Sequence, residues 1–355
     1  MGLIGAGHIA RMHAAVWQQE AQVTAVCSRQ RDKAERIAAE FGIPQIFDTA
    51  DELIHSSSID AICIATPHHL HHPLAMSALN AGKHVFCEKP LAIDLSQARE
   101  MCDLARQTGL KTGIQTAIRT GFPPLIHLKN LLQDDALGPV RYFEGVWGFD
   151  WARRADYPMG WRFRTAEGGT GALGDLGVYM IDAALWLAGK IDRVCADLTT
   201  HIARRPQLSE RYDFSESRRL HRQGMLPPPV GWADVENDDA CTLLLHFRGG
   251  GQGMIRATRL SQRNTICIET ADADFAWDRQ DETLQRRNAG EDCYIPEPVP
   301  DFPKTSIATS FLRNIETDEN APPTFFDGLR IQEVMEAAVV SAKERRWVEI
   351  QEVTA

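Results

Sequence analysis

Apolar and polar positions follow two different patterns along the chain, and the change falls near residue 120. Before it, short apolar runs typical of buried strands are separated by stretches with the apolar spacing of helices. Strands are predicted at the N-terminus and at 23–27, 61–65, 84–87 and 111–115, and helices at 32–41, 74–81 and 95–107. Strands that alternate with helices predict an α/β fold with a parallel, doubly wound (Rossmann) sheet.

After residue 120 the strands are expected to be neighbours without helices between most of them. They are predicted at 140–147, 193–201, 240–247, 253–259 and 265–270, with a glycine-rich hairpin connection at 246–251. The polar, arginine-rich stretch 204–231 is predicted to be a long loop, and a helix at 328–345 precedes a short strand at 347–350. This second part is therefore expected to be an α+β domain with a large, mostly antiparallel sheet, and the predicted domains are 1–120 and 121–355.

A glycine turn, Gly5–Ala10, stands directly behind the first apolar residues and ahead of a helical pattern. Gly5 permits a tight turn, Gly7 lets the backbone approach a pyrophosphate, and Ala10 keeps the helix near the sheet. Free N–H groups and the helix dipole favour an anion at that helix N-terminus. The pattern predicts a dinucleotide site, and because only four residues precede the turn we expect a short native extension ahead of Met1.

Composition narrows the class of protein. A chain of 355 residues predicts two domains, and 44% hydrophobic with 24% charged residues is typical of a globular protein. The net charge of −10 argues against a nucleic-acid partner. The sequence has neither an apolar stretch of roughly 18 residues nor a signal-peptide pattern, so we expect a cytoplasmic protein without a membrane partner. Its eight cysteines form no C-x-x-C pair and are predicted to be free, buried thiols.

A second motif, Glu88-Lys89-Pro90, follows the predicted strand 84–87 and would place a lysine at the carboxyl edge of the sheet. With the glycine turn, it resembles the oxidoreductase family named for glucose-fructose oxidoreductase and inositol dehydrogenase (Gfo/Idh/MocA). The resemblance continues over nearly the whole chain, in 65–71, 81–85, Trp161-Arg162, 168–179 and 326–330. It implies a Rossmann domain that binds NAD(P) and a second domain that binds substrate and forms oligomers. The implied activity is that of a nicotinamide-dependent dehydrogenase or reductase acting on a sugar, anhydrosugar or polyol.

The resemblance also implies three catalytic residues. Lys89 would contact the reacting oxygen and stabilise its alkoxide-like charge, and Asp175 would bind substrate. Tyr179 replaces the usual histidine, as in the glucose-fructose oxidoreductase and dihydrodiol dehydrogenase branch. Beside Lys89 and a cationic nicotinamide its proton affinity would be lowered, so that it serves as general acid/base. Alternatively Tyr179 only packs on a helix face and Lys89 handles the proton. Arg119 and Asp182 are further substrate-binding candidates, although Asp182 equally suits an anchor for a neighbouring arginine.

The residues after the second strand bear on the choice of cofactor. A carboxylate there would favour NAD, whereas a basic group accommodates the 2′-phosphate of NADP. Ser28 leaves room and Arg29 can bind a phosphate through paired hydrogen bonds, so NADP is expected, with NAD as the alternative. In the competing interpretation Arg29 and Arg31 are solvated charges. The full set of predicted cofactor-binding residues is Gly5, Gly7, His8, Ile9, Ser28, Arg29, Thr66, Pro67, His71, Glu88, Lys89, Trp161 and Arg162.

Other interpretations stay open. Trp161 also suits a core position. His68, His69, His71 and His72 form a cluster, but no Cys or acidic residue has ligand spacing, so no metal site is predicted. His71 matches a family histidine expected to line the cofactor pocket or cap the next helix, and the other three are expected to be solvated. Competing functions are a dihydrodiol dehydrogenase-like enzyme and a non-catalytic dinucleotide sensor. The family also implies a homodimer or homotetramer through the second sheet, whose uncovered face would otherwise favour aggregation.

Overall fold

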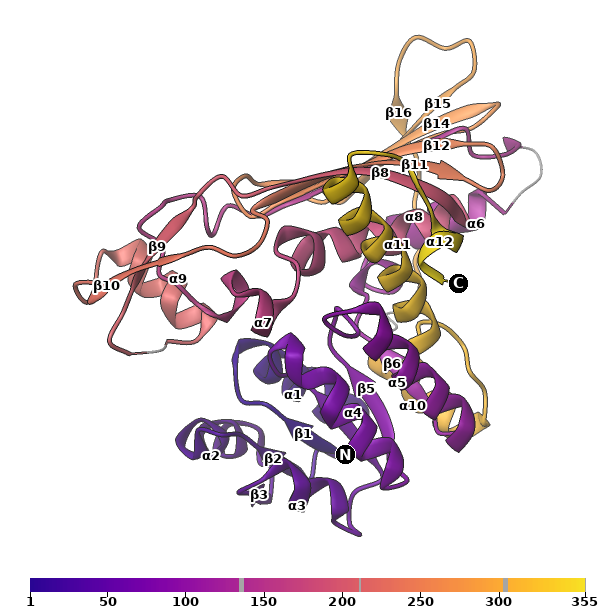
Figure 1. Cartoon of the computed structure of the whole chain (residues 1–355). Coiled ribbons are helices and arrows are strands. Elements are labelled where there is room, and N and C mark those ends of the chain that lie inside the picture. Colours follow the sequence, from indigo (N-terminus) through magenta and orange to yellow (C-terminus); the bar gives the residue numbers. More distant parts are fainter. Residues whose placement is uncertain (134–136, 211, 303–305, 355) are drawn as a thin grey trace.

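A computed structural model describes residues 1–133, 137–210, 212–302 and 306–354, and these residues form two large sheets and one two-stranded sheet (Figure 1). The first is a six-stranded parallel sheet in the order β3-β2-β1-β4-β5-β6, which confirms the predicted doubly wound fold. Its strands are β1 (Gly2–Ile4), β2 (Ala25–Cys27), β3 (Gln45–Phe47), β4 (Ala61–Ile64), β5 (His84–Cys87) and β6 (Thr112–Ile114). The order reverses between β1 and β4, which is the point at which open α/β sheets form a ligand-binding crevice, at the carboxyl ends of the strands.

Helices connect these strands. They are α1 (His8–Glu20), α2 (Arg31–Phe41), α3 (Ala50–His55), α4 (His71–Asn80) and α5 (Leu95–Thr108). All residues of β1, β2, β4 and β6 are buried, as expected for a sheet covered on both faces. Strand β3 and helix α3 were not predicted. Strand β3 lies at the sheet edge and is only half-buried, so its sequence lacks a continuous apolar signal.

The C-terminal part of the chain returns to the first domain. Helix α10 (Ile307–Thr317) places Phe311 in one core with Trp17 and Phe86, and the Trp17 and Phe311 rings meet edge to face at 5.9 Å. Helix α11 (Phe325–Glu344) begins with Phe325 in the core beneath α5 and continues to the second sheet. The domain boundary at residue 120 stays a prediction. It assigns α10 and the start of α11 to the second domain, although both pack in the core of the first.

The second sheet has nine strands in the order β16-β15-β14-β13-β7-β12-β11-β8-β17, and only the β7–β12 pair is parallel among these described strands. The predicted, mostly antiparallel sheet is thereby confirmed. Its strands are β7 (Tyr142–Gly148), β8 (Ile191–Thr199), β11 (Ala240–Phe247), β12 (Gln252–Thr258), β13 (Arg263–Glu269), β14 (Ala273–Asp278), β15 (Thr283–Asn288), β16 (Ile295–Pro296) and β17 (Val348–Glu349).

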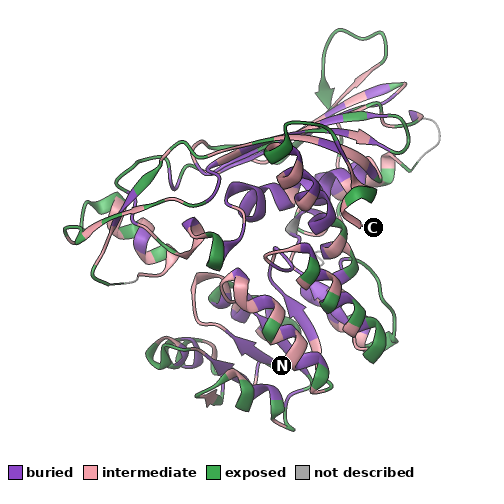
Figure 2. Cartoon of the chain, in the orientation of Figure 1, coloured by how far each residue is buried: buried purple, intermediate pink, exposed green. Residues whose placement is uncertain are grey.

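One face of this sheet carries the domain core and the other is left uncovered by the described helices. Helices α6 (Pro123–Leu131), α8 (Val178–Leu187) and α11 pack on the inner face (Figure 1). Exposed and partly exposed residues alternate with buried ones along β11–β14, so the outer face is in contact with solvent (Figure 2). This part also contains α7 (Thr165–Gly168), the π-helix η5 (Leu173–Gly177), α9 (Phe214–Gln223) and α12 (Ile350–Thr354), with short 3₁₀ turns at Ala117–Arg119 and Trp161–Phe163.

The prediction of a long loop at 204–231 is wrong. The segment forms β9 (Arg204–Gln207), which pairs antiparallel with β10 (Gly231–Asp234), and helix α9 (Phe214–Gln223) between them. Asp213 caps α9 by accepting a hydrogen bond from the Glu216 N–H at 2.9 Å. The helix was missed because Ser217 is its one buried residue, which leaves no apolar stripe to recognise. Arg211 lies outside the described residues.

The cysteines are free thiols, as predicted. Five of them are buried and two are half-buried, but Cys293 is exposed, so the prediction of burial is wrong for that residue. Among the described residues no helix has the length and apolarity needed to cross a membrane. A cytoplasmic location stays a prediction.

Candidate active site

Lys89 and Asp175 meet at the carboxyl edge of the parallel sheet. Lys89 follows β5, and Asp175 lies in η5 of the second domain. The Lys89 Nζ donates hydrogen bonds to the Asp175 backbone oxygen at 2.5 Å and to its Oδ1 at 3.0 Å. The side chains are 10% and 12% exposed. The Arg162 Nε lies 3.7 Å from the other carboxylate oxygen of Asp175, so two cations from different domains converge on one carboxylate.

Lys89 and Asp175 each stabilise the charged form of the other. Burial by itself would lower the pKa of Lys89, but the nearby Asp175, with Tyr179 and Glu88, raises it above its usual value. Burial would likewise raise the pKa of Asp175, but Lys89 and Arg162 hold it well below its usual range. Lys89 is therefore an ammonium and Asp175 a carboxylate at neutral pH. The ammonium is a hydrogen-bond donor rather than a base in the free chain.

Tyr179 completes the predicted catalytic set. It stands four residues after Asp175, in α8, and the Lys89 Nζ lies 4.9 Å from the centre of its ring. The ring also packs against Trp147 at 5.5 Å. Burial raises the pKa of Tyr179 by more than the Lys89 charge lowers it. In the free chain the Lys89 charge alone therefore does not lower the proton affinity of Tyr179, and the lowering expected beside a bound nicotinamide stays a prediction.

Glu88 links the Lys89 loop to the first helix. Its Oε1 lies 2.7 Å from the His13 Nε2, and its Oε2 accepts a hydrogen bond from the Lys89 N–H at 3.2 Å. Burial would raise the pKa of Glu88, but the hydrogen bond and charge of His13 lower it. His13 was missed by the sequence analysis. Its only signal was a polar residue on the face of α1 that also carries buried Ala10, Ala14 and Trp17.

The glycine turn fits the diphosphate of a dinucleotide. Gly5 has φ +119°, and a Cβ there would lie 2.2 Å from the Ala65 backbone oxygen. Gly7 is the N-cap of α1 and makes no side-chain cap, and a Cβ on it would meet nothing within 4 Å. No described side chain caps the first N–H groups of α1 at this N-cap, so they are suited to binding an anion. His8 and Ile9, at the first two helical positions, are half-buried beside it.

The two arginines beyond β2 differ. Arg29 is exposed and makes no hydrogen bond or ion pair with any described residue, while the neighbouring Ser28 Oγ accepts from the Gln30 N–H at 3.2 Å. Arg31 is held by Glu35 at 3.1 Å and by Asp48. Of the two, only Arg29 is free to meet a ligand.

Histidines tie the loop after β4 to its surroundings. Half-buried Thr66 and Pro67 begin this loop. His71 is buried, with Nδ1 2.8 Å from the Pro90 oxygen and Nε2 3.1 Å from the Thr66 oxygen, so it joins the two loops that face the crevice. Burial lowers its pKa.

The expectation that the other three histidines are solvated is wrong for His68, which is buried, while His69 and His72 are half-buried. The loop docks on the second domain, where the His68 Nδ1 lies 2.9 Å from the Gly168 oxygen and the His69 Nδ1 lies 3.2 Å from the Glu167 oxygen. His72 pairs with Glu100 at 2.9 Å. Within the described ranges, no group of three His, Cys, Asp or Glu side chains is arranged to hold a metal ion.

Trp161 and Arg162 are positioned by a buried polar network that the sequence analysis missed. The Arg162 guanidinium lies 4.3 Å over the half-buried Trp161 ring, and its backbone oxygen accepts from Asn237 at 3.0 Å and Arg259 at 2.9 Å. Asp238 accepts the backbone N–H groups of the segment leading to η5, at 2.6 and 2.8 Å. The available signal was three polar residues, 237–239, directly before the apolar strand β11.

Arg119 and Asp182 form a buried ion cluster. The Asp182 Oδ1 accepts from two nitrogens of Arg119 at 2.5 and 2.9 Å, and Asp327 accepts from a third at 2.8 Å. Asp182 has no exposed surface. The arrangement supports the alternative in which Asp182 anchors an arginine. Contact of either residue with substrate stays a prediction.

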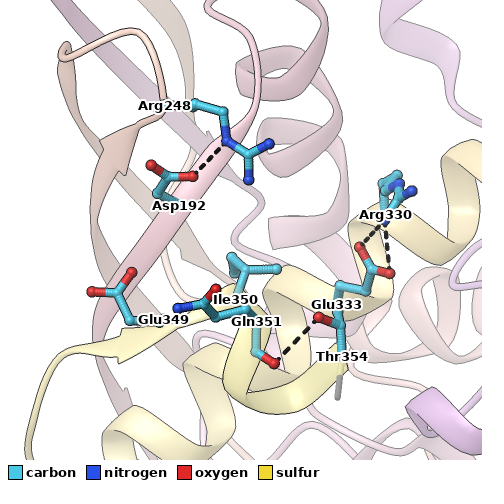
Figure 3. A pocket seen from close by; sticks show the side chains of 8 residues that line it. All are labelled: Asp192, Arg248, Arg330, Glu333, Glu349, Ile350, Gln351 and Thr354. Atoms are coloured by element: carbon cyan, nitrogen blue, oxygen red, sulfur yellow. Dashed lines mark hydrogen bonds and ion pairs between the residues drawn. The ribbon is translucent and has the colours of Figure 1, made fainter.

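A polar hollow of about 360 Å³ lies apart from these residues, between β8, β17, α11 and α12 (Figure 3). Its charged groups are largely paired, with Arg248 on Asp192 at 2.9 Å and Arg330 on Glu333 at 2.8 Å. It contains none of the predicted site residues.

The crevice between the glycine turn and Lys89 is that of a dinucleotide-dependent oxidoreductase. Residues 1–116 match the family described as "Oxidoreductase family, NAD-binding Rossmann fold", and residues 125–274 match "GFO/IDH/MocA C-terminal domain". The chain belongs to the GFO/IDH/MocA oxidoreductase family, as the sequence motifs predicted, and is an NAD(P)-dependent dehydrogenase or reductase.

Two relatives and one solved structure show which members of the family this chain is similar to. Levoglucosan dehydrogenase from Pseudarthrobacter phenanthrenivorans is 28% identical over 393 residues, which cover 100% of this chain and 99% of the relative. Trans-1,2-dihydrobenzene-1,2-diol dehydrogenase from Mus musculus is 28% identical over 256 residues, 71% of this chain and 66% of the relative. A structure of levoglucosan dehydrogenase with NADH and L-sorbose has a TM-score of 0.85 at 25% identity, covering 100% and 99% of the two chains.

Proposed function

We propose that the protein transfers hydride between NADP and a sugar, anhydrosugar or polyol, and so interconverts C–OH and C=O. The observation that carries this proposal is the contact of Lys89 with Asp175 and Tyr179 at the edge of the sheet that bears the open Gly5–Gly7 turn. The similarity to levoglucosan dehydrogenase over the whole chain supports a sugar-like substrate.

The chain supplies charge stabilisation and a proton path. The nicotinamide, when bound, would supply or accept the hydride. The Lys89 Nζ donates to the reacting oxygen and stabilises the negative charge that develops there. Because the pKa of Lys89 is raised, it retains its proton, and we assign the proton transfer to the Tyr179 hydroxyl. Asp175 keeps Lys89 charged and in place through its bonds at 2.5 and 3.0 Å.

An activity screen tests the proposal directly. Reduction of NADP+ and NAD+ is measured with levoglucosan, aldoses, inositols and cyclic diols, and any active substrate is then used with Lys89→Ala and Tyr179→Phe. Both variants should lose roughly 10²–10⁴-fold in turnover, the usual range for general acid–base catalysis, while they still bind cofactor. Tyr142→Phe, on β7, is the matched control.

Each contrary result has a specific meaning. Full activity of Tyr179→Phe would mean that Lys89, and not Tyr179, transfers the proton. Tight cofactor binding without turnover of any compound would favour a dinucleotide sensor over an enzyme.

The preference for NADP is proposed from Arg29. The guanidinium is exposed and unpartnered among the described residues, at the strand end where a 2′-phosphate would lie. Dissociation constants for NADPH and NADH should reverse their order in Arg29→Glu and keep it in Arg36→Glu, which alters another exposed arginine nearby. An unchanged NADPH preference in Arg29→Glu would contradict the assignment.

A cyclic diol is the second candidate substrate. The Tyr179 ring packs at a tilt against Trp147, whose ring lies 6.2 Å from both Phe122 and Phe149, and such an aromatic cluster suits an apolar ring. The mouse dihydrodiol dehydrogenase is also similar to this chain. The buried charges of Lys89 and Asp175 favour a polyhydroxylated substrate instead. The two candidate substrates are distinguished by measuring kcat/KM for levoglucosan and for a dihydrodiol.

We also propose a homodimer or homotetramer through the outer face of the nine-stranded sheet. Leu244, near the middle of β11, is 46% exposed on that face. Light scattering at micromolar concentration should show an oligomer that Leu244→Lys weakens. A monomeric wild-type protein would contradict this proposal.

A further inference from the structure

Helix α9 belongs to the second domain (Figure 1), but two of its N-terminal residues lie close to side chains of α1 and α2. Its N-cap Asp213 lies 3.8 Å from the Lys33 Nζ on α2. The ring of Phe214 is 6.3 Å from that of His8, the first residue of α1, and the Arg162 guanidinium lies 4.7 Å over the same Phe214 ring. Phe214 therefore touches both a residue at the phosphate end of the crevice and one that reaches Asp175.

The second domain itself holds α9 in this place. Phe214 meets Trp151 edge to face at 5.2 Å, within a cluster of buried aromatic side chains. The His221 Nε2 lies 2.9 Å from Asp156, and its ring meets Tyr157 at 5.4 Å. The position of α9 is thus fixed by contacts that need no ligand.

Arg218, one turn after Phe214, makes no ion pair with a described residue, and Asp150 is the carboxylate whose charge acts on it from further away. Its guanidinium lies 5.5 Å over the Phe214 ring, and its Nε is buried with no hydrogen-bond partner in the described part of the chain. The electrostatic neighbours of His8 include Arg11, Arg162 and Arg218, with one opposing carboxylate, Asp213.

The other two arginines near His8 are already occupied. Arg11 binds Glu40 at 2.5 Å, and Arg162 faces Asp175 at 3.7 Å. Arg218 makes no ion pair with a described residue. An unpaired, half-buried arginine beside an uncapped helix N-terminus has the charge and hydrogen-bond donors that a diphosphate requires.

We propose that Arg218 binds the diphosphate of the dinucleotide from the second domain, opposite the N–H groups of α1. The inference rests on the proposed function, since it takes the crevice to be a dinucleotide site. A guanidinium pairs with phosphate oxygens through two parallel hydrogen bonds, which lysine cannot reproduce. Arg218 thereby extends the cofactor site onto a helix that the glycine motif does not include.

The test compares ligands that differ in phosphate content. Calorimetric titrations measure the dissociation constants of NADPH, ADP-ribose and adenosine for the wild-type protein, Arg218→Gln and Arg218→Lys. Arg219→Gln is the matched control, because among the described residues this exposed neighbour bonds only Gln223, at 3.0 Å, within its own helix. We expect Arg218→Gln to weaken NADPH and ADP-ribose about tenfold or more, as for loss of a charged hydrogen bond. Adenosine should bind as before, and Arg218→Lys should restore part of the loss.

Three results overturn the inference. The first is a dissociation constant for ADP-ribose that is unchanged in Arg218→Gln. The second is a loss of ADP-ribose affinity in Arg219→Gln as large as that in Arg218→Gln. The third is a loss of adenosine affinity in Arg218→Gln as large as that of ADP-ribose, which would indicate a structural effect. Urea unfolding of each variant shows separately whether α9 remains folded. If the wild-type protein binds neither NADPH, NADH nor ADP-ribose, the proposed function fails together with the inference, whereas normal wild-type binding with an unaffected Arg218→Gln refutes the inference alone.

Discussion

The two glycines of the turn are expected to respond to alanine in opposite ways. At Gly5, φ is +119° and a Cβ would lie 2.2 Å from the Ala65 oxygen, so β1 and the end of β4 must separate by about 1.2 Å to reach ordinary contact at 3.4 Å. Two hydrogen bonds lie at this point, from the Gly5 N–H to Cys27 and from the Ala65 N–H to Ile4, both 2.9 Å. The strained φ costs about 1–3 kcal/mol and each weakened bond about 1 kcal/mol, so Gly5→Ala should destabilise by roughly 4 kcal/mol.

Gly7→Ala should leave the fold intact and impair the site. Gly7 has an ordinary φ of −87°, and its Cβ would meet nothing within 4 Å. We expect a stability change below about 1 kcal/mol, as for other changes at an N-cap without a side-chain bond. The new methyl group would occupy the space where the diphosphate is proposed to approach. The dissociation constant for NADPH should then rise at least about tenfold, or about 1.4 kcal/mol.

Urea unfolding followed by circular dichroism, with NADPH titration of each folded variant, measures both effects. A Gly7→Ala variant that binds NADPH as tightly as wild type would refute the placement of the diphosphate. A Gly5→Ala variant as stable as wild type would refute the argument from the close approach to Ala65.

Three further predictions concern the supports of the site. Asp238→Asn should cost about 1–3 kcal/mol of stability and lower kcat, because one amide oxygen replaces a carboxylate that accepts two buried N–H groups; an unchanged kcat contradicts this. Glu88→Gln and His13→Asn should show a coupling energy above about 0.5 kcal/mol in a double-mutant cycle of stability, and additivity would contradict their pairing. Burial holds the pKa of His68 well below 6.5, so the unfolded chain binds more protons and stability should fall as pH drops below 6.5. His68→Asn should flatten that fall in the urea midpoint, and an unchanged slope would show that His68 does not cause it.

The first domain could be read from the sequence because its strands are buried on both faces. Strand β4, for example, is four buried residues in succession, and β3 escaped notice because it lies at the edge. Helix α9 was not predicted because it has almost no buried face. It is a polar helix held by its cap and by Phe214, and neither produces a periodic apolar pattern.

The proximity of the three candidate catalytic residues could be predicted from the sequence, but the electrostatics around them could not. The sequence motifs predicted that Lys89, Asp175 and Tyr179 lie in one site, and in the structure the three side chains are close together. The direction of the Tyr179 pKa depends on burial against Trp147, which no spacing in the sequence reveals. The histidines after β4 were likewise misjudged, because a docking surface more than ninety residues later removes His68 from water.

The contacts between the domains are unequal at the two ends of the crevice. At the reacting end, Lys89 bonds Asp175 and His68 bonds the Gly168 oxygen, and these side chains are almost fully buried. At the phosphate end, Lys33 and Asp213 are 3.8 Å apart and 19% and 30% exposed, a pair of the kind that contributes little. The proposed catalytic residues are therefore held together in the free chain, whereas the proposed diphosphate end has only this exposed ion pair between the domains. Binding energy gained at Arg218 would then close the weaker end without disturbing Lys89.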